Sequence, residues 1–100
     1  MTYKKLDSLE QLLGCYFHQD WTDEFGNVAS ALHAIIRSEP KERLLDCVEE
    51  IDALLAASLS ENDLMAILTD QFGCYFDPNS DGLTCEQWLK RIQEKFVQLN

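Results

Sequence analysis

The 100 residues suffice for one domain, and a composition of 46% hydrophobic and 26% charged residues is typical of a globular protein. The apolar stretches are short and interrupted by charges, which excludes a membrane span, and no signal peptide is apparent at the N-terminus, so we expect a cytoplasmic protein. A formal net charge of −10 argues against binding to nucleic acid or to an anionic membrane, because phosphate repels it.

The first predicted helix covers about residues 9–17. Ser8 and Gln11 form a capping-box pattern, and apolar residues then recur at helical spacing. The stretch 18–27 is polar and aromatic and is expected to be a loop or a short turn.

Two further helices are predicted in the middle of the chain. Asn27 can cap the first of them, whose apolar face begins at Val28. Pro40 suits the first turn of the next, because a proline there loses no hydrogen bond. The apolar residues of 44–55 then keep the helical period.

The last two predicted helices begin at Ser60 and Thr84. Ser60 is a cap followed by acids, Gly73 ends that helix, and Thr84 forms a second capping box with Gln87. The inner face of the last helix is formed by Trp88, Leu89, Ile92, Phe96 and Leu99. The sequence thus predicts an all-α fold, a compact single-domain bundle of about five short helices over residues 1–100.

The negative charge is concentrated in one stretch. Residues 44–89 contain ten acidic residues and no Lys or Arg, whereas the rest of the chain contains eight acidic and eight basic residues. The whole net charge therefore lies in this stretch, which favours a basic protein partner, since opposite fields steer an encounter.

Two motifs have a structural interpretation that we favour over a binding role. Gly-Cys-Tyr-Phe occurs at 14–17 and again at 73–76, and we expect both copies to pack aromatic side chains in the core. Residues 77–82 match the opening of a calcium loop, but its twelfth position holds Trp88 instead of the required Glu. An Asx/Gly turn is the favoured interpretation of that segment.

No metal, cofactor or catalytic site is predicted. The four cysteines have no metal-ligand spacing and are expected to be structural thiols. His18 and His33 match no site together with the nearby Cys15 and Asp20. We therefore expect a protein that is not an enzyme.

The sequence resembles the CdiI immunity proteins of contact-dependent growth inhibition systems. The similarity covers about residues 6–92, and its most specific part is Tyr-Phe-His-Gln-Asp-Trp at 16–21. It extends through Ile-Asp-Ala-Leu-Leu-Ala at 51–56 and Gly-Cys-Tyr-Phe-Asp-Pro at 73–78.

The resemblance implies an immunity protein that binds and neutralises the C-terminal toxin domain of a CdiA-type effector, without catalysis. Such toxins are commonly nucleases, whose clefts are basic, so an acidic surface could occlude the active site non-covalently. The alternative is an acidic adaptor or nucleic-acid mimic that binds a basic host protein. A calcium-binding module and a small enzyme are weaker alternatives.

Two candidate partner-binding regions follow from the acidic residues. The first is an exposed helical face with the first turn of the next helix, comprising Glu42, Asp46, Glu49, Glu50, Glu61 and Asp63. The second is a pair of loops, comprising Asp20, Trp21, Asp23 and Glu24 with Asp77, Asn79 and Asp81. We expect a monomer or a weak dimer, the latter through an exposed aromatic residue such as Trp21.

Overall fold

Six α-helices and two short helical turns form the computed structural model, which describes residues 6–98. The helices are α1 (Asp7–Tyr16), α2 (Trp21–Phe25), α3 (Val28–Ser38), α4 (Lys41–Ala56), α5 (Glu61–Ala66) and α6 (Cys85–Val97). A π-helical turn, η1 (Ile67–Gln71), continues α5, and a 3₁₀ turn, η2 (Pro78–Asp81), precedes α6. Within residues 6–98 there is no strand, which confirms the all-α prediction.

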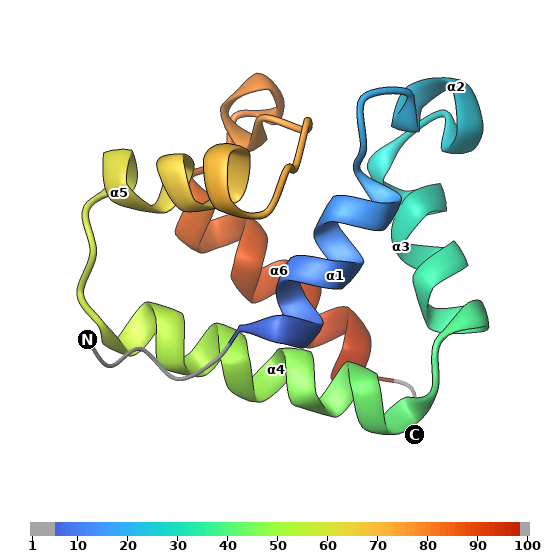
Figure 1. Ribbon diagram of the computed structural model, residues 1–100, viewed down its shortest axis with the longest axis horizontal. Coiled ribbons are helices and arrows are strands. Elements are labelled where there is room, and N and C mark those ends of the chain that lie inside the picture. Colours follow the sequence, from blue (N-terminus) through green and yellow to red (C-terminus); the bar gives the residue numbers. More distant parts are fainter. Residues whose placement is uncertain (1–5, 99–100) are drawn as a thin grey trace.

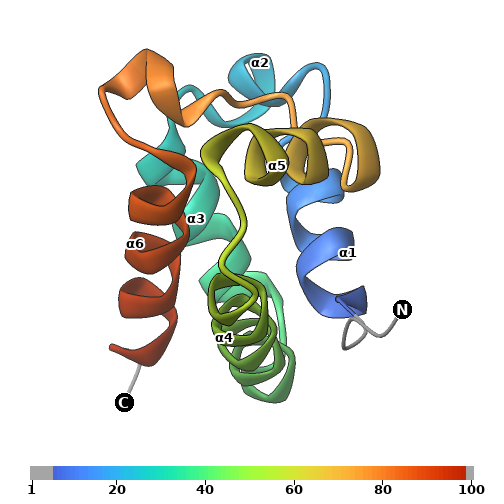
Figure 2. The same ribbon diagram turned by 90° about the vertical axis from the view of Figure 1, so that its left-hand side faces the viewer.

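The long helix α4 runs along one side of the molecule and packs against both α1 and α6 (Figure 1). Viewed along α4, these two helices stand on either side of it (Figure 2). The turn η2 and helix α2 both lie at the end remote from α4, with η2 above the start of α6 and α2 above α3 (Figure 1). The two ends of the molecule therefore present different surfaces.

Three of the predicted helix caps are confirmed. The side chains of Asn27, Ser60 and Thr84 each accept a hydrogen bond from the backbone N–H three residues later. The capping box of Thr84 is complete, because the Gln87 side chain accepts from the Thr84 N–H at 2.9 Å. These short polar side chains satisfy donors that a helix N-terminus leaves unpaired.

The prediction for the first helix start is wrong. Ser8 lies inside α1 and is buried, and no side chain caps the preceding Leu6. The stretch predicted as a loop or short turn contains α2, which raises the number of helices to six. Pro40 occupies the N-cap of α4, one residue before its first turn. Leu99, predicted on the inner face of the last helix, lies outside the described residues.

The two Gly-Cys-Tyr-Phe segments pack against each other. The expectation that both copies place aromatic side chains in the core is confirmed for Phe17 and Phe76, whereas Tyr75 is exposed. The Tyr75 N–H donates to the Phe17 carbonyl at 2.7 Å, and the Phe17 and Phe76 ring centroids are 6.1 Å apart. A Cβ on Gly14 would lie 2.6 Å from the Phe72 carbonyl oxygen, so only glycine permits this approach. These contacts join α1 to the segment after η1.

The hydrophobic core extends from α1 through α4 to α6. Its fully buried members include Leu13, Ile35, Ile51 and Trp88. None of the helices formed by residues 6–98 is long and apolar enough to cross a membrane.

Candidate functional site

The first candidate surface is the outer face of α4. Glu42, Asp46 and Glu49 are exposed there, at a spacing that places them on one side of the helix. Leu45 is also exposed on this helix, so the acidic residues surround an apolar side chain. Charged groups around an apolar centre are typical of a protein interface. We refer to Glu42, Leu45, Asp46 and Glu49 as the α4 surface.

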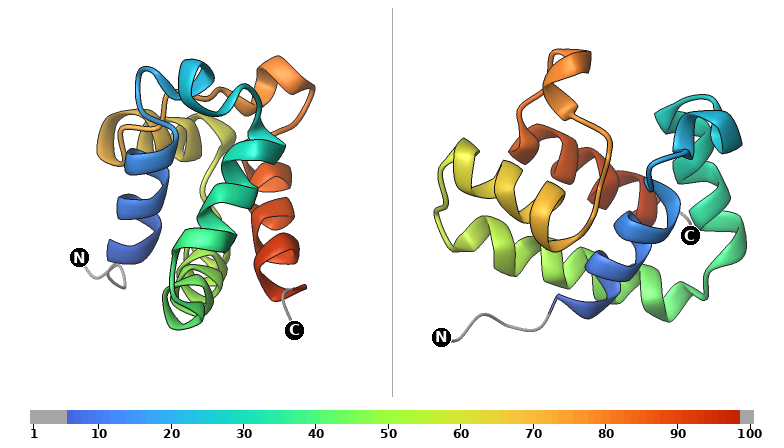
Figure 3. Two further views of the ribbon diagram at one scale, coloured as in Figure 1. Left: turned by 90° about the vertical axis from the view of Figure 1, so that its right-hand side faces the viewer. Right: turned by 45° about the horizontal axis from the view of Figure 1, so that its top comes forward.

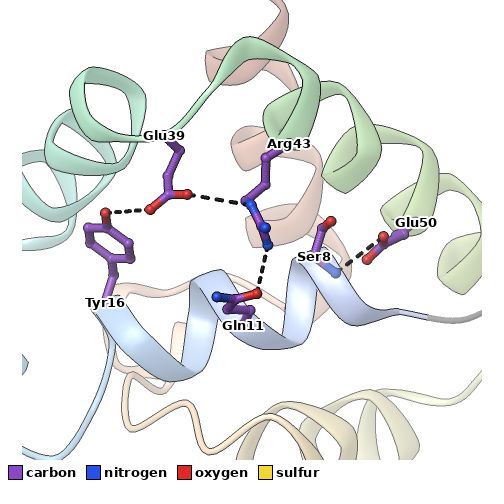
Figure 4. A network of polar contacts seen from close by, with 6 residues as sticks. All are labelled: Ser8, Gln11, Tyr16, Glu39, Arg43 and Glu50. Carbon is purple, nitrogen blue, oxygen red and sulfur yellow. Dashed lines mark hydrogen bonds and ion pairs between the residues drawn. The ribbon is translucent and has the colours of Figure 1, made fainter.

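Glu50 does not belong to this exposed face, contrary to the prediction. Its side chain is buried, with 7% of its surface exposed. One carboxylate oxygen accepts from the Leu9 N–H at 2.8 Å and the other from the Ser8 N–H at 3.3 Å (Figure 4). The carboxylate thus caps the first turn of α1. Backbone donors there have no partner within the helix, and the helix dipole favours negative charge.

A polar network lies beside Glu50, and no local pattern in the sequence indicates it. Tyr16 donates its hydroxyl to Glu39 at 2.9 Å, and the guanidinium of Arg43 contacts Glu39 at 3.5 Å and donates to Gln11 at 2.7 Å (Figure 4). Burial, followed by the Glu39 carboxylate, raises the pKa of Tyr16. These contacts tie α1 to the α3–α4 junction and have a structural role.

Glu61 connects the first turn of α5, predicted in the first candidate region, with η2, predicted in the second. Both of its carboxylate oxygens accept from the Cys85 N–H, at 3.0 and 2.9 Å, and one accepts from the Asn79 side chain at 3.3 Å. Partial burial opposes the charge of Glu61, but these hydrogen bonds outweigh it and lower the pKa of the carboxyl. Glu61 therefore acts at the start of α6, whereas Asp63 on the same helix is exposed.

The second candidate surface is the end of the molecule formed by α2 and η2. Asp20, Asp23 and Glu24 are exposed at α2, and Asp77, Asn79 and Asp81 are exposed at η2. We refer to these six residues as the α2–η2 surface. In this surface Glu24 contacts the His18 Nε2 at 2.7 Å.

Trp21 was predicted to belong to this surface but lies in the core. Only 9% of it is exposed, and its ring centroid lies 5.2 Å from that of Phe17 and 5.6 Å from that of Phe76. The prediction of an exposed Trp21 is therefore wrong, and so is its use as the contact of a dimer. Within residues 6–98, the exposed aromatic residue is instead Tyr75, with 62% of its surface accessible.

The segment at residues 77–82 forms the predicted Asx/Gly turn. The Asp77 carboxylate accepts from the Asn79 N–H at 2.9 Å, and Gly82 adopts a left-handed conformation with φ of 76°. Among the described residues, no three His, Cys, Asp or Glu side chains are grouped so that they could hold a metal ion.

Three of the four cysteines are buried thiols, as predicted. Burial raises the pKa of Cys47 to about 12, that of Cys74 to about 11 and that of Cys85 to about 12. A thiol with so high a pKa is a poor nucleophile and a poor metal ligand. Cys15 is exposed on α1.

The comparisons with known proteins agree with this architecture. The sequence profile of a family described as CdiI immunity protein matches residues 5–96. The chain is similar to a chain of the crystal structure of a CdiA-CT/CdiI complex from Y. kristensenii 33638, with 36% identity and a TM-score of 0.87. The similarity covers 93% of this chain and 99% of that one. No curated protein sequence matches the chain.

Proposed function

Because the chain belongs to the CdiI immunity protein family, we propose that it neutralises the C-terminal toxin domain of a CdiA-type effector. It binds the toxin in the cytoplasm without covalent chemistry and is not an enzyme. The observation that carries the proposal is the similarity, over nearly the whole chain, to a chain solved in a CdiA-CT/CdiI complex.

We further propose that the toxin is a nuclease whose active site is covered. A nuclease must hold an anionic substrate, so its cleft is basic. The net charge of −10 lies entirely within residues 44–89, and such a field accelerates association with a basic protein. Occupation of the cleft by carboxylates would compete directly with the nucleic acid.

The test is co-expression with the toxin domain encoded immediately upstream of the gene. We expect a stable complex in a pull-down with the tagged chain, and growth of cells that the toxin alone would arrest. If the toxin domain neither binds nor is neutralised, the proposal is wrong for that pair. Capture of an unrelated basic protein instead would favour the acidic adaptor or nucleic-acid mimic.

Two sets of charge reversals distinguish the candidate surfaces. One carries Asp46→Lys and Glu42→Lys on the α4 surface, and the other carries Asp20→Lys and Asp23→Lys on the α2–η2 surface. Each set replaces two exposed acidic residues, so the change in net charge is the same. The set that weakens toxin binding more identifies the contact surface, because the long-range effect of charge is equal in both.

A further inference from the structure

A groove of about 300 Å³ lies between α3 and α6, beside η2. The two helices run side by side below η2 in the left view of Figure 3. The apolar lining includes Ala29 and Leu32 of α3 and Trp88 of α6. Charged side chains of Asp81, Arg91 and Lys95 complete the lining. The groove thus combines an apolar wall with two cations on one helix.

Trp88, which lines the groove, also carries a buried donor that has no partner within residues 6–98. Its side chain is 1% exposed, and its indole Nε1 is the buried side-chain nitrogen or oxygen that has no hydrogen-bond partner within residues 6–98. A buried N–H without an acceptor is destabilising, and indole N–H groups usually find one. A ligand that brings an oxygen atom to this donor would remove the deficit.

The two cations of the groove also lack an ion-pair partner among residues 6–98. Lys90 on the same helix forms an ion pair with Glu86 at 3.1 Å. No hydrogen bond or ion pair of Arg91 or Lys95 is found within the described part of the chain. Their spacing of four residues places both on one side of α6. In a chain with a net charge of −10, this is an exposed cationic pair beside an apolar wall.

We propose that the groove receives an acidic side chain of the toxin domain, an inference that rests on the proposed function. The carboxylate faces Arg91 and Lys95, while the apolar part of the segment packs on Ala29 and Leu32. Because the Trp88 Nε1 is buried, the side chains that cover it move when the carboxylate offers it an oxygen. Because Asp81 repels a carboxylate, the carboxylate of the toxin lies on the α6 side of the groove.

The groove is continuous with the α2–η2 surface. Asp81 belongs to both, and α2 leads directly into α3 through Asn27. A toxin seated on this end of the molecule would meet carboxylates at α2 and η2 and cations on α6. Because this end of the molecule presents carboxylates at one place and cations at another, only one orientation of the toxin pairs opposite charges. The reversed orientation would place like charges together.

Affinity measurements on the complex with the toxin domain test this inference. We expect Arg91→Gln with Lys95→Gln to raise the dissociation constant at least about tenfold, as loss of a paired charge does at other interfaces. The matched control is Arg37→Gln with Lys90→Gln, which removes the same charge from outside the groove and should change the constant less than about threefold. Ala29→Phe, which fills the groove but retains both cations, should also weaken binding.

A second measurement follows Trp88 directly. The NMR resonance of its indole N–H, distinguished from that of Trp21 with the Trp21→Phe variant, should shift downfield when the toxin domain binds. A complex that forms with the resonance unchanged would overturn the inference, as would equal affinities of the groove variant and its control. Absence of any complex with the wild-type chain would instead refute the proposed function itself.

Discussion

Single residues of one type have different roles in this protein. Glu49 and Glu50 are neighbours on α4, yet the first is exposed and the second is 7% exposed. The difference arises because α1 begins over Glu50 and brings two unpaired backbone donors to its carboxylate. A buried charge is tolerated when it is hydrogen-bonded and lies at the positive end of a helix dipole.

Replacement of Glu50 by Ala should therefore reduce stability. The substitution leaves the Ser8 and Leu9 N–H groups without an acceptor, and we expect the free energy of unfolding to fall by about 1–3 kcal/mol. Asp46→Ala on the same helix is the control and should change it by less than about 0.5 kcal/mol, because Asp46 is exposed. Urea unfolding of the variants measures both. Equal stabilities would contradict the assigned role of Glu50.

The cysteines allow a second prediction at this scale. In the native protein at about pH 8, we expect a thiol reagent to modify Cys15 rapidly, because the buried Cys47, Cys74 and Cys85 stay protonated. All four thiols should react in denaturant. Mass spectrometry of peptides from the labelled protein identifies the modified residue, and rapid native labelling of Cys85 would be inconsistent with the structure.

At the scale of elements, single contacts join segments that are distant in the sequence. Glu61 in the first turn of α5 accepts hydrogen bonds from the start of α6 and from η2. Gly14 in α1 approaches the backbone of Phe72, directly after η1. The junctions between short helices are thus held by specific polar and steric contacts as well as by the core.

The contribution of Glu61 should depend on pH. Its pKa is lowered in the folded protein, so its stabilisation is complete above the ordinary carboxyl pKa and is lost as the pH falls through the folded value. At about pH 7 we expect Glu61→Gln to reduce the free energy of unfolding by about 1 kcal/mol, the usual loss for a helix cap. The difference should shrink below about pH 4. An identical difference at both pH values would refute the role of the charge.

Gly14 should not tolerate a side chain. A Cβ would lie 2.6 Å from the Phe72 carbonyl oxygen, which belongs to the backbone and cannot rotate away. We expect Gly14→Ala to lower the free energy of unfolding by about 1–3 kcal/mol, although alanine favours helices more than glycine. Cys15→Ala at the neighbouring exposed position is the control, and thermal melting compares the two variants. A more stable Gly14→Ala would show that the segments separate readily.

For the whole molecule, the distribution of charge determines how it meets a partner. The α4 surface and the α2–η2 surface carry exposed acidic residues, as do other helices, while Arg91 and Lys95 line the groove between α3 and α6. An overall field of −10 attracts a basic protein over a distance, whereas the groove acts only at contact. Association rate and orientation are therefore governed by different residues.

Association with the toxin domain should slow as salt is added. Between about 20 and 500 mM NaCl we expect the association rate constant to fall at least about tenfold, because counterions screen the attraction between exposed charges. The dissociation rate should change less, since it depends on buried contacts. Stopped-flow fluorescence measures both rates, and an association rate independent of salt would refute electrostatic steering.

The sequence alone predicted the helical class, most helix starts and the family resemblance. These depend on local signals, namely apolar spacing and caps such as Asn27, Ser60 and Thr84, whose hydrogen bonds reach only three residues along the chain. The acidic stretch at residues 44–89 and the turn at residues 77–82 can likewise be recognised from contiguous sequence.

Only the tertiary structure decided which acidic residues and aromatic rings reach the surface. The spacing of Glu50 and Trp21 in the sequence does not reveal that both are buried. Glu50 is covered by the start of α1, and Trp21 packs on Phe76. Each of these partners lies more than 40 residues away along the chain. The groove likewise exists only because α3 and α6 pack side by side. Packing between distant segments determines these features, whereas the local pattern determines the helices.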